Sequence, residues 1–370
     1  RDALAHCQFT STHLSSVVVS QFYSLLTPFI ERIFAPLSIT HRSPPLSLTP
    51  QCSRFPHLFT GHPLSSPGKV YYLFGFNTEL DLLEAQLYEL EEVVDRFIII
   101  EAKATSRGAR KPIFFDRNKA TRFARFLPKV IHLILDETDL SPWLGKEFPD
   151  GIFYDIEVLT RDLLFRRFFE SLSAAAADGG TEVMFGPNDI TMFSDVDEMV
   201  PAELVRDIKG CQWTSAANKG TVSPSMIKTN GDMERNCGGW NHFVFAKSTV
   251  LKTHRRDGDL VLPCCDGLHV SSYVHPAVFL SKYVSVAEAG CSSFPNKWQD
   301  VTWLRYCTML NRNSWRKNLF CNPQKDMWVP WVVKSNPDRY PFLLSNHSLT
   351  KQEMGELNNR WSSCPEIKHC

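Results

Sequence analysis

Three carboxylates crowd into one short stretch of the chain, M-F-S-D-V-D-E-M at residues 192–199, directly after an apolar run. On extended backbone, side chains two positions apart point the same way, so Asp195 and Asp197 can converge on one hard cation such as Mg²⁺ or Mn²⁺. A cation held there would bridge to phosphate oxygens and neutralise a leaving diphosphate. Glu198 completes the cluster of candidate catalytic residues.

Two other interpretations of this cluster stay open, and one is excluded. It could be a solvated turn before a helix that Pro201 begins, since proline is tolerated at a first helical position. It could belong to a haloacid-dehalogenase-type phosphatase with Asp195 as nucleophile, although Met199 stands where that motif usually has Thr or Val. A calcium EF-hand loop is excluded, because the glycine at its sixth position is missing.

Composition bounds the function classes. The 370 residues contain 40 basic and 40 acidic side chains, so the net charge is zero, which argues against nucleic acid as the main partner. The hydrophobic content of 43% is enough for a large core. The 11 cysteines form no metal-like repeat, so a few disulfides and scattered reduced thiols are both open readings.

The N-terminal part of the chain has a different character from the rest. Residues 14–30 are mostly apolar but slightly short for a bilayer span, so they are either a weak signal anchor or a tail fragment. Residues 35–68 are rich in proline and serine without periodicity, which is typical of a stem or linker. We therefore expect a disordered tail or stem over 1–69, a catalytic domain over 70–345 and a C-terminal tail over 346–370.

From Val70 onward, apolar runs alternate with helical patterns. Strands are expected near 70–76, 97–101, 130–135 and 190–193, and helices near 77–95, 117–126, 155–172 and from 201 onward. Asn77 suits the N-cap of the first helix, while Asp81 and Glu84 should face solvent or pin that helix. After residue 210 the pattern weakens, with strands near 241–246 and 267–273 and a helix near 299–310.

This alternation predicts an α/β fold with a mostly parallel sheet covered by helices on both faces. In such sheets ligands bind beyond the carboxyl ends of the strands. The polar residues at three of these ends should then lie together: Asn77 and Glu79, Glu101, and Asp195 with Asp197.

Five blocks of sequence, in this order, resemble glycosyltransferase family 17, the family of the bisecting β-1,4-mannosyl-glycoprotein N-acetylglucosaminyltransferase. They are F-G-F-N-T-E-L-D-L-L-E-A-Q-L-Y-E-L, V-V-D-R-F-I-I-I-E-A-K-A-T, K-P-I-F-F-D-R-N, S-D-V-D-E-M-V-P and G-L-H-V-S-S-Y. The resemblance covers roughly residues 70–345. It implies an inverting, metal-dependent transferase that uses a UDP-sugar, with a GT-A-like (Rossmann-like) fold.

The resemblance also assigns residues to the metal. Asp195 and Asp197 would hold Mn²⁺ or Mg²⁺ and the diphosphate. His269 falls in the family's G-W-H block and would be a third ligand, as neutral imidazole is a good one; a core histidine satisfied by backbone is the alternative reading.

Further residues are expected at the nucleotide. Asn77 and Glu79 match the family's first block, and Glu101 is a candidate to bond the ribose or uracil. Lys111 and Arg117 could pair with phosphate or with a carboxylate, although a solvated surface position is open for each. Glu157 and Arg161 match a family helix, where an ion pair between residues four apart is the simpler reading.

The chain departs from the family pattern at Leu268 and Val270, where the family has Trp and Cys. The catalytic base is unassigned, with Asp232, Asp266 and Asp300 as candidates. These departures leave room for a degenerate member that only binds sugar or a partner.

The expected activity is transfer of N-acetylglucosamine from UDP-GlcNAc to a mannose of an N-glycan core in a β-1,4 linkage. The expected setting is the Golgi membrane with a luminal catalytic domain. The partners would then be the nucleotide-sugar and a glycoprotein N-glycan, with no nucleic acid and at most a single N-terminal membrane anchor.

Overall fold

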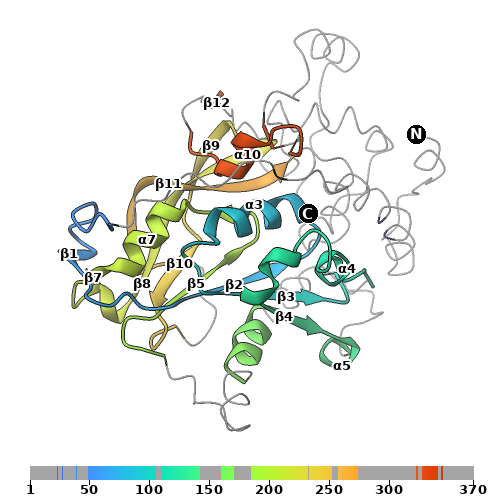
Figure 1. Ribbon diagram of the computed structural model, residues 1–370, viewed down its shortest axis with the longest axis horizontal. Helices are drawn as coiled ribbons and strands as arrows, with labels where there is room; N and C mark the ends of the chain where they lie inside the picture. The colour runs from blue at the N-terminus through green and yellow to red at the C-terminus, as the bar shows by residue number, and fades with distance from the viewer. Residues whose placement is uncertain are drawn as a thin grey trace, which may run out of the picture.

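The computed structural model describes a defined part of the chain (Figure 1). The described residues are 23, 27, 39, 49–105, 110–141, 160–170, 185–231, 233–251, 257–273, 322–323, 327–340 and 343–344. The expected helix near 299–310, the expected tail 346–370 and nearly all of the apolar stretch 14–30 lie outside them. Among the described residues, no helix is long and apolar enough to cross a membrane.

Four neighbouring strands of the main sheet run parallel, in the order β5-β2-β3-β4. Their bounds are β2 Val70–Phe76, β3 Arg96–Ala102, β4 Val130–Leu135 and β5 Ile190–Asp195. The central strands are continuous apolar runs because both of their faces are buried. In register, Gly75 of β2 lies beside Asp195 and Phe76 lies beside Glu101, so these two carboxylates flank the same end of β2.

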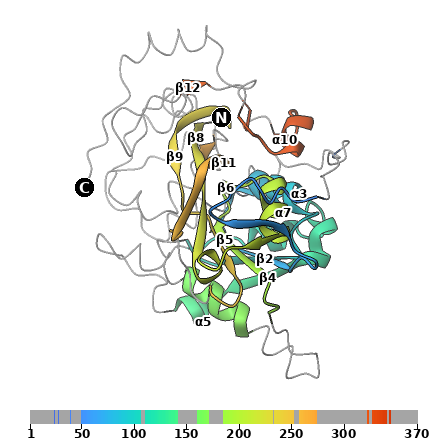
Figure 2. The same ribbon diagram turned by 90° about the vertical axis from the view of Figure 1, so that its left-hand side faces the viewer.

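The second half of the sheet is not parallel. It continues from β5 through β10 Val244–Lys247, β8 Thr221–Gly231, β9 Arg235–Trp240 and β12 Asn322–Pro323, each antiparallel to its neighbour. The long strand β11 Leu260–Tyr273 runs parallel to β8 and pairs with the short β6 Glu198–Met199. Figure 2 shows this part curling away from the parallel strands.

The expectation of a GT-A-like (Rossmann-like), mostly parallel α/β sheet is therefore wrong: the sheet is mixed and curled. The expectation came from the strand–helix alternation before residue 210. Hydrophobic periodicity identifies strands but carries no information about their direction. The antiparallel half is built from residues after 210, where the sequence pattern is weak.

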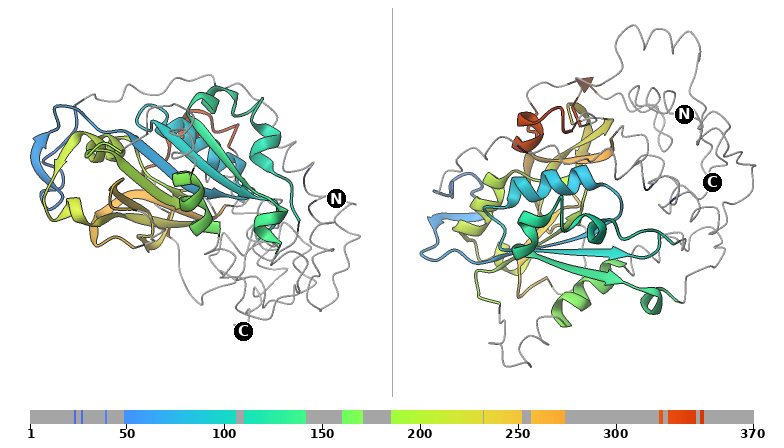
Figure 3. Two further views of the ribbon diagram at one scale, coloured as in Figure 1. Left: turned by 90° about the horizontal axis from the view of Figure 1, so that it is seen from below. Right: turned by 45° about the vertical axis from the view of Figure 1, so that its right-hand side comes forward.

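Helices cover both faces of the parallel strands (Figure 3). On one face lie α3 Leu80–Leu90 and α7 Ala202–Gly210, whose apolar residues pack with Tyr72, Phe74 and Phe97. On the other face, residues 160–170 are helical, and their apolar side chains pack with Tyr71, Leu73 and Ile98. The remaining elements are α4 Phe114–Asn118, η1 Ala124–Lys129, α5 Glu137–Leu140, β7 Cys211–Trp213, η2 Ala217–Lys219 and α10 Trp331–Ser335.

Helix α3 begins later than the sequence predicted. Glu79, not Asn77, is its N-cap residue. Asp81 and Glu84 do not face solvent: both carboxylates accept hydrogen bonds from Arg122, at 2.7 and 2.6 Å, inside the core. Burial raises the pKa of Asp81 to about 6. These buried pairs pin α3 to the segment before η1. This agrees with the alternative expectation that Asp81 and Glu84 pin the helix.

Part of the expected stem belongs to the fold. Strand β1 Phe59–Pro63 pairs with β7, and a disulfide joins Cys52 to Cys211. Phe55 and Leu58 are buried in the main core. The described fold thus includes residues N-terminal to Val70, the position at which the sequence pattern placed its start.

Candidate functional site

The acidic turn, residues 195–198, lies where β5 ends and β6 begins. Its three carboxylates differ in exposure: the side chain of Asp195 is 34% exposed, whereas Asp197 and Glu198 are buried. The turn lies at the carboxyl end of the parallel strands, because the buried apolar strand β5 stops at Asp195. The apolar run before the cluster therefore anchors these carboxylates.

Glu198 is held by donors from two other parts of the fold. Its Oε1 accepts a 2.7 Å hydrogen bond from the indole N–H of Trp240, and its Oε2 accepts one of 3.2 Å from the backbone N–H of Asp195. Its carbonyl oxygen accepts a 2.9 Å bond from the side chain of Gln86 on α3. This buried carboxylate therefore fixes the shape of the acidic turn.

A hydroxyl pair under the turn adds to this network. The Tyr72 hydroxyl lies 2.6 Å from the hydroxyl of Ser194 and also bonds the side chain of Gln86. Burial raises the pKa of Tyr72 well above its usual value, and the neighbouring Glu198 acts in the same direction. Tyr72 therefore stays a neutral hydrogen-bonding group beneath the carboxylates.

His269 lies next to the acidic turn on β11. It is directly opposite Glu198 in the antiparallel β11–β6 pair, and its Nε2 is 3.7 Å from Asp197 Oδ2. Gly267 makes this pairing possible: its φ is +151°, and a Cβ there would lie 2.4 Å from the carbonyl oxygen of Met199. A glycine two residues before His269 thus brings the imidazole to the turn.

Trp240 on β9 contacts two members of the predicted site. Besides bonding Glu198, its ring stacks on the imidazole of His269, with centroids 4.0 Å apart and planes inclined by 29°. Lys228 on β8 places its ammonium 4.8 Å from the centroid of the same indole. Trp240 and Lys228 are not among the residues predicted from the sequence, because their closeness to the site depends on the antiparallel half of the sheet.

Asp195 has a different neighbour. The Nη2 atom of Arg161 lies 3.3 and 3.2 Å from its two carboxylate oxygens. The sequence reading paired Arg161 with Glu157, which lies outside the described residues. That pairing stays a prediction, and the structure shows Arg161 reaching the acidic turn from the helical residues 160–170.

The arrangement fits a cation only in part. Among the described residues, no three His, Cys, Asp or Glu side chains lie close enough together to hold a metal ion. Asp197 Oδ2 and His269 Nε2 lie 3.7 Å apart, slightly more than the roughly 3–3.5 Å that metal–ligand bonds of about 2.1 Å put between neighbouring ligand atoms, so a small side-chain adjustment would let both bind one cation. Of the predicted metal ligands Asp195, Asp197 and His269, the structure therefore brings two together and pairs the third with Arg161.

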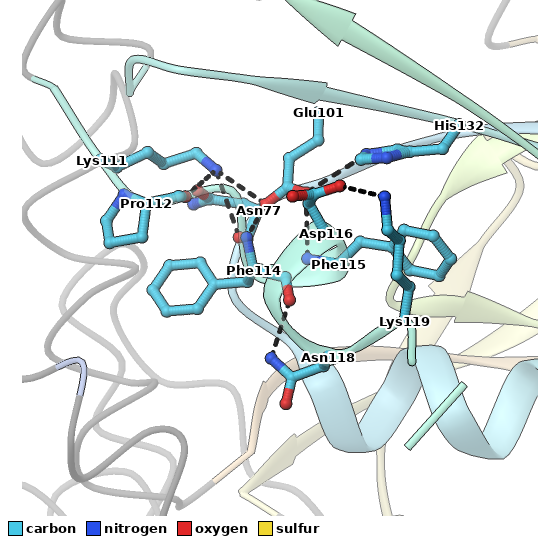
Figure 4. A network of polar contacts seen from close by, with 10 residues as sticks. All are labelled: Asn77, Glu101, Lys111, Pro112, Phe114, Phe115, Asp116, Asn118, Lys119 and His132. Carbon is cyan, nitrogen blue, oxygen red and sulfur yellow. Dashed lines mark hydrogen bonds and ion pairs between the residues drawn. The ribbon is translucent and has the colours of Figure 1, made fainter. Parts of the chain in front are cut away.

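Glu101 lies at the centre of a separate buried network (Figure 4). Its two oxygens accept hydrogen bonds from the backbone N–H groups of Phe114 and Phe115, at 2.5 and 3.0 Å, at the start of α4. The ammonium of Lys111 lies 3.3 Å from the same carboxylate, and Nε2 of His132 lies 3.4 Å from it. Burial lowers the pKa of Lys111, and Glu101 opposes that shift.

These contacts bear on two of the residues expected at the nucleotide. The carboxylate of Glu101 caps α4 and compensates the charge of Lys111, so both residues already have defined partners in the fold. A role for either in binding ribose, uracil or phosphate stays a prediction.

The other expected nucleotide residues lie near this network but are not equally buried. Lys111 Nζ is 3.4 Å from the carbonyl oxygen of Asn77, which links the end of β2 to the Glu101 network. The buried Glu79 accepts a 2.9 Å bond from the backbone N–H of Thr78. Arg117 is exposed on α4. Their roles toward a nucleotide also stay predictions.

One of the three candidate bases can be placed. Asp266 is paired with Arg54, which also lies 3.6 Å from Asp207. Burial raises the pKa of Asp266 above its usual value. Asp232 and Asp300 lie outside the described residues.

The two departures from the family pattern lie on the core side of β11. Leu268 and Val270 are both 1% exposed and belong to the main hydrophobic core. Side chains alternate along a strand, so His269 between them points to the other face. The replacements therefore leave the acidic turn and its imidazole in place.

Residues 38–273 match the family model of glycosyltransferase family 17, which is more than half of the chain. The match spans the acidic turn, Arg161, Trp240 and His269. No curated protein matches the chain.

Proposed function

Since the chain belongs to glycosyltransferase family 17, we propose that it moves N-acetylglucosamine from UDP-N-acetylglucosamine to a mannose hydroxyl of an N-glycan core. The proposed reaction inverts the anomeric carbon and forms a β-1,4 linkage. The family match establishes a glycosyltransferase domain, and the donor, acceptor and linkage are the proposed part.

One observation carries the proposal: a buried imidazole and an aspartate meet 3.7 Å apart beside the acidic turn at a sheet edge. In this proposal Asp197 and His269 hold Mn²⁺ or Mg²⁺. When bound, the cation would stabilise the negative charge that develops on the departing UDP. Glu198 keeps the turn in shape by fixing the amide of Asp195 and the indole of Trp240.

The disulfide supports a setting for this activity. A bond between Cys52 and Cys211 persists in oxidising compartments such as the secretory pathway. N-glycans are present in the same compartments. We therefore propose that the domain works in the lumen of the Golgi.

The test is a transfer assay on the full chain. UDP-N-acetylglucosamine, Mn²⁺ and an N-glycan core with free mannose hydroxyls are incubated with the protein, and both UDP and the new glycan are measured. The proposal expects UDP release that depends on the acceptor and a product with a β-1,4-linked sugar, assigned by NMR.

Other results would point elsewhere. UDP release without a new glycan would mean hydrolysis, and no release with intact donor binding would mean a degenerate, binding-only member. Hydrolysis of an aryl phosphate that Asp195→Asn abolishes would support a phosphohydrolase and overturn the proposal.

A further inference from the structure

Packing of its helix on the sheet sets the position of Arg161. Phe165, one helical turn after Arg161, packs edge-on against Phe193 of β5 with ring centroids 5.1 Å apart. Residues four apart share a helix face, and residues two apart share a strand face. The contact between the two phenylalanines therefore sets Arg161 over Asp195.

The helix that carries Arg161 is firmly docked. Leu163, Leu164 and Phe168 are buried in the core on this face of the sheet, and Phe168 packs with Tyr71 at a centroid distance of 5.9 Å. The side chain of Arg161 itself is only 12% exposed. A nearly buried guanidinium on a fixed helix is a defined part of the site.

The contact between Arg161 and Asp195 is a loose one. A single nitrogen, Nη2, is shared between both oxygens at 3.2 and 3.3 Å, whereas strong charge-assisted pairs are about 2.7–2.9 Å and often use two parallel bonds. Asp195 is also the most exposed carboxylate of the turn, at 34%. An anion that offers the planar guanidinium two well-placed oxygens can therefore compete with Asp195.

Charge explains why Arg161 and a metal ion would affect each other. The acidic turn holds three carboxylates in four residues, and Arg161 compensates the charge of one of them. A divalent cation on Asp197 would add positive charge a few ångströms away and weaken the hold of Asp195 on the guanidinium. A diphosphate that arrives with the cation restores the balance.

We propose that Arg161 binds the diphosphate of a nucleoside diphosphate donor, and that it rests on Asp195 when no donor is present. This inference rests on the function proposed above. The planar fork of arginine suits phosphate oxygens in a way that lysine does not. Lys111, for which phosphate or a carboxylate was the expected partner, has a side chain only 2% exposed and lies 3.3 Å from Glu101.

The proposal predicts opposite effects on two ligands. In Arg161→Gln, Asp195 loses its positive neighbour, so Mn²⁺ without nucleotide should bind ~2- to 5-fold more tightly, the range of a partly exposed ion pair. UDP at saturating Mn²⁺ should bind ~10- to 100-fold more weakly, because charge-assisted hydrogen bonds to phosphate are lost. Arg161→Lys should bind UDP with an affinity between those of the wild type and Arg161→Gln.

The experiment measures both dissociation constants on the full chain, Mn²⁺ by electron paramagnetic resonance and UDP by calorimetry. The matched control is Arg166→Gln on the same helix, whose side chain is 63% exposed and lies 3.8 Å from Glu170. This control should change neither constant. Circular dichroism checks that each variant folds.

Each other outcome overturns the inference in a distinct way. Unchanged constants in Arg161→Gln would make the pair purely structural, and weaker Mn²⁺ binding would mean that Arg161 orients Asp195 as a ligand. If the folded wild type binds neither Mn²⁺ nor UDP, the proposed function fails together with the inference. If the wild type binds both ligands and Arg161→Gln has the same two dissociation constants as Arg166→Gln, the proposed function stands and the inference about Arg161 alone falls.

Discussion

The indole N–H of Trp240 donates a 2.7 Å hydrogen bond to the buried carboxylate of Glu198 across 42 residues of chain. The same indole stacks on His269. One side chain of β9 thus connects the acidic turn of β5–β6 with the imidazole of β11. This link explains how an antiparallel half-sheet serves a site that begins at the end of a parallel strand.

Removal of that N–H should cost stability and weaken donor binding. Trp240→Phe keeps a ring for His269 but leaves Glu198 Oε1 without its donor, so the free energy of unfolding should fall by about 1–3 kcal/mol. UDP binding should weaken, because Glu198 also holds the backbone N–H of Asp195. Urea unfolding and calorimetry measure the two effects.

Trp331→Phe is the control for Trp240→Phe. The Trp331 indole donates to the carbonyl oxygen of Tyr88, at 3.3 Å, and packs against α3. It should lower stability without changing UDP affinity. Equal UDP affinity in Trp240→Phe and the wild type would contradict the positioning role of Trp240.

The buried pair of Glu101 and Lys111 should behave as one unit. Glu101→Gln leaves the buried ammonium of Lys111 without its counter-charge, and Lys111→Met leaves the buried carboxylate of Glu101 without its counter-charge. Each variant should therefore lower the free energy of unfolding by about 3–5 kcal/mol. The double variant should cost less than the sum of the two, because neither charge then remains.

Lys119→Met serves as the surface counterpart, since Lys119 pairs with Asp116 on α4 with both side chains more than 40% exposed. It should cost no more than about 1 kcal/mol. Additive losses for Glu101→Gln and Lys111→Met in urea unfolding would show that the two side chains are not coupled.

Stability should depend on pH through Glu89. Its carboxylate accepts backbone hydrogen bonds from Ala202 of α7 and Trp331 of α10, and burial raises its pKa to about 7. Glu203 also raises this pKa, while the two backbone bonds and Lys334 lower it.

The direction of that pKa shift decides whether stability rises or falls with pH. The folded pKa is higher than the unfolded one, so the contribution to stability is present below about pH 4.5 and is lost as the pH rises through 7. From pH 4.5 to 8 this group should remove up to about 3 kcal/mol of unfolding free energy. Glu89→Gln should flatten the curve, and parallel curves for variant and wild type would contradict the assignment.

The disulfide should contribute strongly to stability because it closes a long loop. Cys52 and Cys211 are 159 residues apart, and a cross-link of that span restricts the unfolded chain by about 3–5 kcal/mol. Cys52→Ala/Cys211→Ala should therefore unfold at lower urea concentration than the oxidised protein. Dithiothreitol should destabilise the wild type and leave the double variant unchanged; a wild type insensitive to dithiothreitol would contradict this.

The sequence predicted the acidic turn and the carboxyl edge well, for physical reasons. Continuous apolar runs such as 70–76 and 97–101 separated by helices form neighbouring parallel strands, so Glu101 and Asp195 come to one edge of the sheet. The family blocks contributed His269, which the structure places beside Asp197.

The rest depends on contacts that local patterns do not encode. The direction of β8 to β11 follows from long-range pairing, so local patterns predict neither the mixed sheet nor the approach of Trp240 and Lys228 to the site. Helical spacing predicts a neighbour for Arg161 four residues away, whereas its approach to Asp195 depends on the packing of Phe165 on Phe193 and is not visible in the sequence.

In the proposed function, Asp197 with His269 holds the cation that binds the nucleotide-sugar. The most direct measurement is calorimetric binding of UDP-N-acetylglucosamine to the full chain with Mn²⁺ and with EDTA, for the wild type, Asp197→Asn and the control Asp116→Asn, whose side chain is 44% exposed and pairs with Lys119. We expect binding that requires Mn²⁺, that Asp197→Asn abolishes and that Asp116→Asn leaves unchanged. Equal binding in EDTA, or wild-type affinity in Asp197→Asn, would contradict this expectation.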